Sequence, residues 1–294
     1  MARTLLCLGY GYTARALARR LAAAGWRIAA TARTPEKAAM LRADGVGAHL
    51  WDEKGVDPAA FEGADAVLIS TPPGAEGCPA FAAAAGPLAR GAHGVSWIGY
   101  LSSNGVYGDH GGAWVDEKSP LHPSTERARA RLAAEAAWAA QARGHGLPLV
   151  IFRLPGVYGP GRSALDALRE GRARRIFKQG QVFNRMHVDD IATALEASLA
   201  KPRAGALFNL SDDEPAPPQD VIEYACDLLG VAPPPLVPLE EAGLSAMAES
   251  FYADNKRVRN DLMKQALGVA LAYPTYREGL RAILSAGNAR PEPA

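Results

Sequence analysis

The stretch that decides the fold is TLLCLGYGYTA, which occupies residues 4–14. Its apolar run 4–8 has the length and composition of a short buried strand, and this run ends at Gly9 and Gly11. From Ala14 onward, small and apolar side chains recur at helical spacing. The opening segment is therefore predicted to form a strand, a tight turn and a helix, in that order.

Further short apolar runs follow, and most are separated by segments able to form helices. Thr34 and Pro35 are typical of a helix start, as the N-cap and the first helical position. The runs lie at 27–32, 46–50, 66–70, 95–102, 149–153 and 206–210. This alternation predicts an α/β fold, a Rossmann-like, doubly wound parallel sheet with helices on both faces. Such sheets bind ligands at the carboxyl ends of their strands.

The second half of the chain is less regular. Asp189 and Asp190 favour a helix start, because acidic side chains suit the positive end of the helix dipole. After the strand at 206–210, the chain is rich in proline from 215 to 218 and again from 233 to 235, with a helix expected between. We therefore expect a smaller, mostly helical C-terminal subdomain beside the sheet.

Composition excludes several classes of protein. The chain has 294 residues, 48% hydrophobic and 21% charged, which is typical of a folded globular protein rather than a disordered one. A net charge of +1 gives no general reason to bind nucleic acid or a membrane surface. Cys7, Cys78 and Cys226 lack metal-ligand spacing and are too few for a disulfide framework, which favours the cytoplasm and no metal. No apolar run reaches the roughly 20 residues of a membrane span.

The glycine-rich turn predicts a nucleotide site. Gly9, Gly11 and Ala14 occupy the small-residue positions of a G-x-G-x-x-G/A turn between strand and helix, with Tyr12 and Thr13 at the mouth of the helix. The first glycine permits the turn, the second lets backbone N–H groups approach a pyrophosphate, and the small third residue allows close packing. The alternative is a glycine-rich turn with no ligand.

The residue after the second strand bears on which dinucleotide binds. An NAD enzyme usually carries an acid there for the ribose 2′-hydroxyl, whereas this chain has Arg33, which can grip a 2′-phosphate. We therefore expect NADP rather than NAD, unless Arg33 is only a solvated loop residue. Asp52 after the third strand is either a partner for the adenine amino group or a loop cap. Further cofactor contacts are expected directly after the fourth strand, at Ser70, Thr71 and Pro72.

Four later segments carry a family resemblance. They are LSSNGVYG at 101–108, RLPGVYGPGR at 153–162, HVDDI at 187–191 and NLS at 209–211. In this order they resemble the extended short-chain dehydrogenase/reductases, the NAD(P)-dependent epimerase/dehydratase group. The resemblance implies an NAD(P)-binding domain at 1–157 plus 188–212, and a substrate-binding subdomain at 158–187 plus 213–294. It also places Pro155 beside the nicotinamide.

The same resemblance identifies Ser103 as the hydroxyl that holds the reacting oxygen, but the family's Tyr-x-x-x-Lys pair is missing. The corresponding segment, STERARARLAAE at 124–135, puts Arg127 at the tyrosine position and Arg131 at the lysine position. Arginine stays protonated, so Arg127 cannot act as the phenol does. Either both arginines face the pocket, where they would bind the cofactor ribose or an anion, or Arg131 pairs with Glu135 on a surface helix.

Other groups could carry the proton or bind the substrate. Tyr107, Tyr158 and His187 lie near the expected nicotinamide site, although packing or structural hydrogen bonding is the commoner role for each of them. A basic stretch follows at Arg162, Arg169, Arg172, Arg174, Arg175 and Lys178. It suits a diphosphate ligand, or it is a solvated helix with interspersed acids.

Two functions follow from these observations. The first is an NADP-dependent oxidoreductase or epimerase-like enzyme acting on a small hydroxylated, carbonyl or nucleotide-sugar-like substrate, with the proton carrier unidentified. The second is a catalytically inactive NAD(P)-binding sensor or scaffold, motivated by the missing pair. The resemblance also implies a homodimer. The sequence names neither the substrate nor the direction of the reaction.

Overall fold

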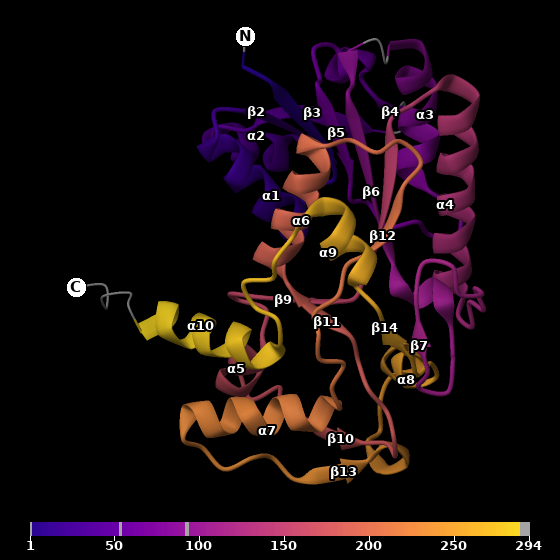
Figure 1. Cartoon of the computed structure of the whole chain (residues 1–294). Coiled ribbons are helices and arrows are strands. Elements are labelled where there is room, and N and C mark those ends of the chain that lie inside the picture. The colour runs from indigo at the N-terminus through magenta and orange to yellow at the C-terminus, as the bar shows by residue number, and fades with distance from the viewer. Residues whose placement is uncertain (1, 53–54, 92–93, 289–294) are drawn as a thin grey trace.

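The computed structural model describes residues 2–52, 55–91 and 94–288, and Figure 1 shows their arrangement. The first half contains β1 (Thr4–Leu8), α1 (Tyr12–Ala23), β2 (Arg27–Ala32), α2 (Pro35–Ala43), β3 (Gly47–Asp52), β4 (Gly55–Val56), β5 (Ala66–Ile69), α3 (Pro79–Gly91), β6 (Trp97–Ser103), β7 (Trp114–Val115) and α4 (Glu126–His145). Short 3₁₀ turns lie at Pro58–Phe61 and Asn104–Tyr107. The order strand, turn, helix at residues 4–14 is confirmed.

The second half continues the alternation and then departs from it. Its elements are β8 (Leu149–Leu154), β9 (Gly156–Tyr158), α5 (Ala164–Arg169), β10 (Arg175–Phe177), β11 (Arg185–His187), α6 (Val188–Ala200), β12 (Leu207–Asn209), α7 (Pro218–Leu229), β13 (Leu236–Pro238), α8 (Ala246–Tyr252), β14 (Arg257–Val258), α9 (Asp261–Leu267) and α10 (Tyr276–Asn288). A further 3₁₀ turn lies at Leu239–Glu241. Strands become short and helices dominate after β12, as the composition predicts.

The central sheet has eight strands in the order β12-β8-β6-β5-β1-β2-β3-β4. All neighbours pair in parallel except β3 and β4. From β1 the chain first adds strands on one side and then, from β5, on the other. The point between β1 and β5 is therefore the topological switch point, where doubly wound sheets hold their ligands.

Alternate residues of each central strand enter opposite cores. On β1, Leu5 and Cys7 pack with α1, α2, α6 and α9, while Leu6 and Leu8 pack with α3 and α4. Side chains that alternate across a pleated sheet produce this division. The result is a three-layer α/β protein, so the predicted fold class is confirmed.

A separate group of elements lies beyond the carboxyl ends of the strands and is called the small lobe here. Helices α5, α7 and α10 share one apolar cluster, and β10 pairs with β13 next to α8. Figure 1 shows this lobe below the sheet. The assignment of the two sets of residues to cofactor and substrate stays a prediction.

Candidate active site

The turn after β1 is shaped by two glycines with different requirements. Gly9 has a φ of +88°, and a Cβ there would lie 3.0 Å from Ser70 Oγ, so this position needs glycine. A Cβ at Gly11, in contrast, would meet nothing within 4 Å. Gly11 is the N-cap of α1 and has no side chain to cap the helix. The first N–H groups of α1 therefore have no side-chain cap, which fits a helix start that binds an anion such as a pyrophosphate.

Hydroxyl groups from neighbouring strands hold this turn in place. Gly9 N–H donates to Thr31 Oγ1 at 2.9 Å, and Ser70 Oγ donates to the Gly9 carbonyl at 2.8 Å. Thr71 Oγ1 donates to the Leu8 carbonyl at 3.3 Å. The side chains of Ser70 and Thr71, expected among the cofactor contacts, thus support the turn, and Pro72 after them is exposed.

The residues expected to recognise the adenosine half of the dinucleotide lie, like the glycine turn, at the carboxyl edge of the sheet. Arg33 directly follows β2 and is exposed, and its side chain makes no hydrogen bond or ion pair with any residue that the structure describes. Asp52 is exposed at the end of β3, in register with Gly55. A free guanidinium at the end of β2 remains available to a ligand.

Tyr12 connects the glycine turn to the segment after β9. Its hydroxyl donates to the Pro160 carbonyl at 2.9 Å, and a Cβ at Gly159 would lie 2.5 Å from this hydroxyl. Thr13, in the same helical turn, is half-buried. The expected pyrophosphate turn and the expected nicotinamide-side segment are therefore fixed to each other.

A cleft of about 800 Å³ opens between the carboxyl edge of the sheet and the small lobe. Ser103 lies in its wall at the end of β6, and Ser103 Oγ accepts a hydrogen bond from Gly105 N–H at 3.1 Å. Pro155, Arg127 and Arg131 line the same cleft, which brings the predicted catalytic residues together. The opposite wall comes mainly from α8 and residues 182–185, with Asp254 and Lys256 beside them.

The two arginines of α4 make different contacts. Arg131 Nη1 donates to the Leu101 carbonyl at 2.7 Å, at the base of the cleft. Arg127 crosses to the small lobe, where its Nη2 donates to Ser250 Oγ at 2.9 Å and its Cζ lies 4.5 Å from the ring centroid of Phe251. The pocket-facing interpretation of these two residues agrees with this geometry.

The alternative, an ion pair between Arg131 and Glu135 on a surface helix, is wrong. Glu135 is 4% exposed and accepts from Ser102 Oγ at 2.5 Å. Its carboxylate also receives Arg153 Nη2 at 2.7 Å and Arg153 Nε at 3.1 Å. Arg153 of β8, rather than Arg131, pairs with this buried carboxylate, because an unpaired buried charge is costly.

Tyr107, Tyr158 and His187 have structural partners and are not among the described residues that line the cleft. The Tyr107 hydroxyl donates to Asn209 Oδ1 at 2.8 Å, and that of Tyr158 donates to the Thr275 carbonyl at 3.3 Å. His187 caps α6, since its Nδ1 accepts from Asp189 N–H at 3.2 Å. Burial lowers the pKa of His187. These contacts favour the structural interpretation of all three.

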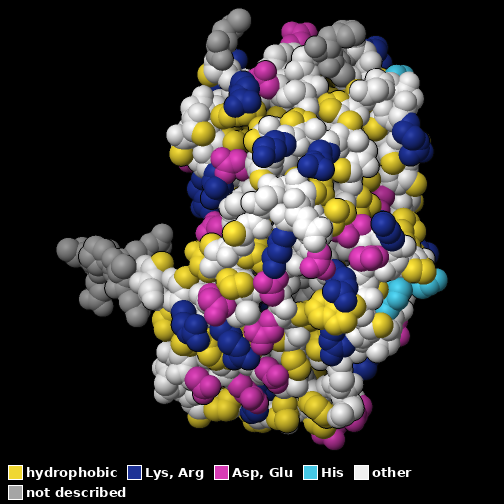
Figure 2. Space-filling model, viewed as in Figure 1, with side chains coloured by type: hydrophobic (Ala, Val, Ile, Leu, Met, Phe, Trp, Pro, Cys, Tyr) yellow, Lys and Arg dark blue, Asp and Glu magenta, His cyan; other side chains and the backbone are white. Residues whose placement is uncertain are grey.

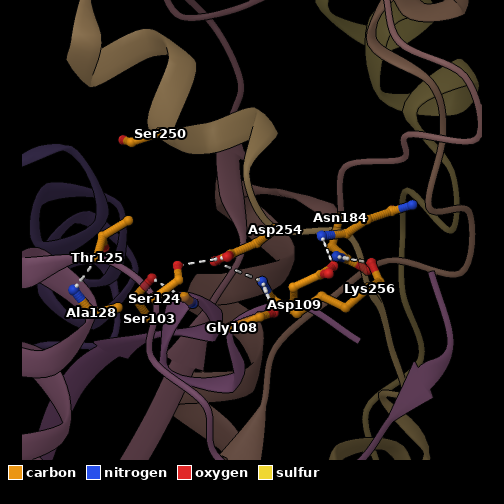
Figure 3. A network of polar contacts seen from close by, with 12 residues as sticks. Ser103, Gly108, Asp109, Ser124, Thr125, Ala128, Asn184, Ser250, Asp254 and Lys256 are labelled. Atoms are coloured by element: carbon orange, nitrogen blue, oxygen red, sulfur yellow. Dashed lines mark hydrogen bonds and ion pairs between the residues drawn. The ribbon is translucent and has the colours of Figure 1, made fainter. Parts of the chain in front are cut away.

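Sequence reasoning missed a row of polar groups on the far wall, which Figure 3 shows. Ser124 Oγ donates to Asp254 Oδ1 at 2.6 Å, and Asp254 Oδ2 lies 3.6 Å from Lys256 Nζ. Lys256 is 7% exposed and donates to the Gly108 carbonyl at 2.9 Å. Burial lowers its pKa. The one local signal in the sequence was the charged and polar run 254–257, which directly follows the apolar residues 251–253.

The basic stretch 162–178 is not one solvated helix, because helix α5 covers only Ala164–Arg169. Arg162, Arg172 and Arg174 line a second cavity of about 400 Å³, together with Tyr158 and Arg185. Arg162 and Arg185 also line the cleft. The two hollows therefore share a basic border, which is suited to an anionic group.

Other kinds of site find no support in the described residues. Among them, no group of three or more His, Cys, Asp or Glu could hold a metal, and no helix is long and apolar enough to cross a membrane. The three cysteines carry free thiols. On the face that Figure 2 shows, acidic and basic side chains are mixed rather than gathered by sign.

The fold and this edge of the sheet are those of a Rossmann-like, doubly wound α/β protein. Residues 87–211 match the model of the NAD dependent epimerase/dehydratase family, and residues 4–84 match a family described as NADP oxidoreductase coenzyme F420-dependent. Over residues 87–211 the chain is thus similar to the NAD-dependent epimerase/dehydratase family, which confirms the resemblance seen in the sequence.

Solved structures agree over nearly the whole chain. A functionally unknown conserved protein from Silicibacter pomeroyi is 50% identical, with a TM-score of 0.90 over 97% of this chain and 99% of that one. A UDP-glucuronic acid 4-epimerase from Bacillus cereus in complex with NAD is 17% identical, with a TM-score of 0.76 and 96% of each chain covered. The second likeness shows the shared fold.

Curated relatives match over shorter stretches. A 3-diazoavenalumate denitrifying reductase from a Streptomyces species is 29% identical over 178 residues, which are 57% of this chain and 55% of the reductase. A dTDP-glucose 4,6-dehydratase from Streptomyces griseus is 27% identical over 128 residues, 40% of this chain and 38% of that enzyme. The chain spans about half the length of the first of these relatives and less of the second. Reductases and nucleotide-sugar dehydratases are thus both among the similar proteins.

Proposed function

We propose that this protein is an NADP-dependent oxidoreductase or epimerase-like enzyme that acts on a small hydroxylated, carbonyl or nucleotide-sugar-like substrate. One observation carries the proposal: Ser103 lies in an open cleft at the same carboxyl edge of the sheet where Gly11 leaves the start of α1 uncovered. A dinucleotide on α1 and a substrate oxygen at Ser103 would then be held at the carboxyl ends of β1 and β6, the two strands that flank β5.

The preference for NADP rests on Arg33. Its exposed guanidinium at the end of β2 can form two parallel hydrogen bonds with a 2′-phosphate, which NAD lacks. The similarity of residues 4–84 to an NADP oxidoreductase family supports this choice. Several similar structures, including the Bacillus cereus epimerase, hold NAD, so the two dinucleotides must be compared directly.

In this mechanism the chain positions the reacting groups. Bound NADP(H) supplies hydride transfer. The Ser103 hydroxyl donates to the substrate oxygen and holds it as charge develops there. Arg131, with its carbonyl partner Leu101 at the base of the cleft, places a fixed positive charge beside Ser103. Pro155 and Gly156 form the adjoining wall.

Because the family's tyrosine is missing, the role of proton carrier is unassigned, and Lys256 is the residue best suited to it. It lines the cleft, and burial lowers its pKa, so its ammonium gives up a proton more readily than that of a surface lysine. Asp254 and the Gly108 carbonyl hold the ammonium group in place. Arg127 cannot take this role, because a guanidinium keeps its proton.

The test compares dinucleotides by thermal shift. NADP(H) is expected to raise the melting temperature more than NAD(H) at equal concentration, because binding to the folded state alone stabilises it. Arg33→Met should weaken NADP binding by roughly tenfold or more and leave NAD binding unchanged. Lys37→Met, an exposed cation on α2, is the matched control. Equal shifts for both dinucleotides in the parent protein would remove the NADP assignment.

Absorbance at the nicotinamide band then reports turnover across a panel of carbonyl compounds and nucleotide sugars. The alternative function, an inactive NAD(P)-binding sensor, is favoured by Arg127, which stands at the tyrosine position and contacts α8. Binding of NADP(H) without turnover of any member of the panel would support the sensor. The three free thiols fit the cytoplasm, where we propose that the protein acts.

A further inference from the structure

The cleft has an unbalanced charge. Four guanidinium groups line it, those of Arg127, Arg131, Arg162 and Arg185, and none of them forms an ion pair with a described residue. Among the described lining residues the one acid is Asp254, which already contacts Lys256 and Ser124. The cleft is thus basic although the whole chain carries only +1. A concave surface of one sign concentrates ligands of the opposite sign.

Arg127 is the member of this group that reaches across the cleft to α8, and most of its donors are unused by the described residues. It is exposed, and to described residues it donates one hydrogen bond, to Ser250 Oγ at 2.9 Å. A guanidinium carries five N–H donors in a planar fork. Its Cζ lies over the Phe251 ring, 4.5 Å from the centroid, so the guanidinium is held between this ring and Ser250. An oriented fork with free donors suits a carboxylate or phosphoryl group.

The wall beside Arg127 is apolar. Met247 and Phe251 of α8 are 64% and 55% exposed, and both line the cleft. Val182 and Phe183 continue this surface on the neighbouring segment. Large apolar side chains left exposed around a hollow are typical of a ligand-binding surface.

We propose that Arg127 binds the anionic group of the substrate, and that the substrate is an organic anion whose apolar or aromatic body lies against α8. The claim that this anion is the substrate rests on the proposed function. The claim that Arg127 binds an anion rests only on the contacts of Arg127. In this proposal, Arg127 stands at the position of the family's proton-transferring tyrosine but recognises the substrate instead of transferring a proton.

Ligand-observed NMR titration tests the proposal with four probes: cinnamate, its uncharged amide cinnamamide, phenyl phosphate and uridine diphosphate. Each is titrated with and without NADP⁺. We expect cinnamate or phenyl phosphate to bind at least tenfold more tightly than cinnamamide, and more weakly as salt is raised. Whichever of the two binds better identifies the charged group as a carboxylate or a phosphoryl group.

Three variants locate the anion. Arg127→Met should weaken binding of the preferred anion roughly tenfold, whereas Arg127→Lys, which keeps the charge but not the fork, should retain part of it. Arg129→Met is the matched control, because this exposed arginine of α4 does not line the cleft and, among the described residues, its side chain hydrogen-bonds the Ser124 and Pro123 carbonyls alone. Circular dichroism confirms that each variant is folded.

Some outcomes would overturn the proposal. Equal binding of cinnamamide and cinnamate would show that charge is not recognised. An equal loss in Arg127→Met and Arg129→Met would reduce the effect to general electrostatics. Binding of uridine diphosphate alone, unchanged in Arg127→Met, would move the anion to the second cavity. Because the titration without NADP⁺ needs neither cofactor nor turnover, a failure of the proposed function leaves this test intact.

Discussion

Glu135 of α4 and Arg153 of β8 form a buried, two-pronged ion pair, with Nη2 to Oε2 at 2.7 Å and Nε to Oε1 at 3.1 Å. Both side chains are nearly inaccessible, at 6% and 4%. On a helix, residues four apart share a face, so fixing Glu135 against the sheet also turns Arg131 toward the Leu101 carbonyl of β6, while Arg127, one turn further, reaches the small lobe. One buried pair therefore sets the rotation of α4 and with it the basic wall of the cleft.

Removing one member of this pair should be strongly destabilising. Glu135→Gln leaves the Arg153 charge buried without a counterion, so we expect the free energy of unfolding to fall by about 3–5 kcal/mol. The double variant Glu135→Leu with Arg153→Met should lose less, because no charge is then left unpaired. Urea unfolding measures both.

The Arg20–Glu196 pair is the control for this prediction. Its side chains are 43% and 34% exposed, so Glu196→Gln should cost less than about 1 kcal/mol. If Glu135→Gln costs no more than Glu196→Gln, the buried pair does not orient α4 in the way argued above.

Substitutions at Gly11 should affect folding stability and dinucleotide binding in different ways. Gly11→Asp puts a favoured N-cap residue at the start of α1, where a Cβ meets nothing within 4 Å, so stability should be kept or raised. Its carboxylate would repel a pyrophosphate, and dinucleotide affinity should fall by tenfold or more. Calorimetric titration and thermal unfolding measure the two effects.

Gly11→Ser is the uncharged counterpart of that variant, since serine caps a helix as well as aspartate does. It should bind dinucleotide more tightly than Gly11→Asp does. Undiminished dinucleotide affinity in Gly11→Asp would place the cofactor away from α1.

Ser103→Ala should slow turnover of any substrate found by roughly 10²–10³-fold in kcat, because it removes a donor aimed at the reacting oxygen. KM should change less, since ground-state binding draws on other parts of the cleft. Ser96→Ala, just before the amino end of β6, is the matched control, because its hydroxyl contacts the Asp65 carbonyl far from the cleft. Full activity in Ser103→Ala would leave this serine without a catalytic role.

His187 should make the protein less stable in mild acid. Burial lowers its pKa below the ordinary value of 6.5, and Asp189 and Asp190 only partly oppose this. Between the lowered native pKa and 6.5 the unfolded chain binds more protons, so the free energy of unfolding falls as the pH drops through this window.

The slope contributed by His187 is at most about 1.4 kcal/mol per pH unit. His187→Asn keeps an N-cap acceptor for α6 but does not titrate. The stability of this variant should therefore vary less with pH over roughly the one and a half units below the ordinary value of 6.5. Urea unfolding at several pH values measures the slope. His145→Asn, at the exposed end of α4, should leave the slope near that of the parent protein.

The sequence by itself determined the sheet and the turn. Strand, turn and helix at residues 4–14 follow from local properties, namely the apolar run, the helical spacing and the positive φ that Gly9 adopts. The later strands follow from the same alternation, and the segments at 101–108 and 153–162 placed Ser103 and Pro155 at the carboxyl edge. Such signals lie within a few residues of one another, so they can be read without the tertiary structure.

Only the tertiary structure decided which face of α4 meets the cleft and what stands opposite. The buried Glu135–Arg153 pair shows which face of α4 meets the sheet. The helical spacing of 127, 131 and 135 could not show this, because it is equally compatible with a surface helix. The composition of the opposite wall depends on contacts between residues far apart in the sequence. Arg127 and Ser250 are 123 positions apart, and Lys256 and Gly108 are 148 positions apart. Side-chain burial and ion pairing are properties of the packed chain, because they depend on which segments exclude water from each other.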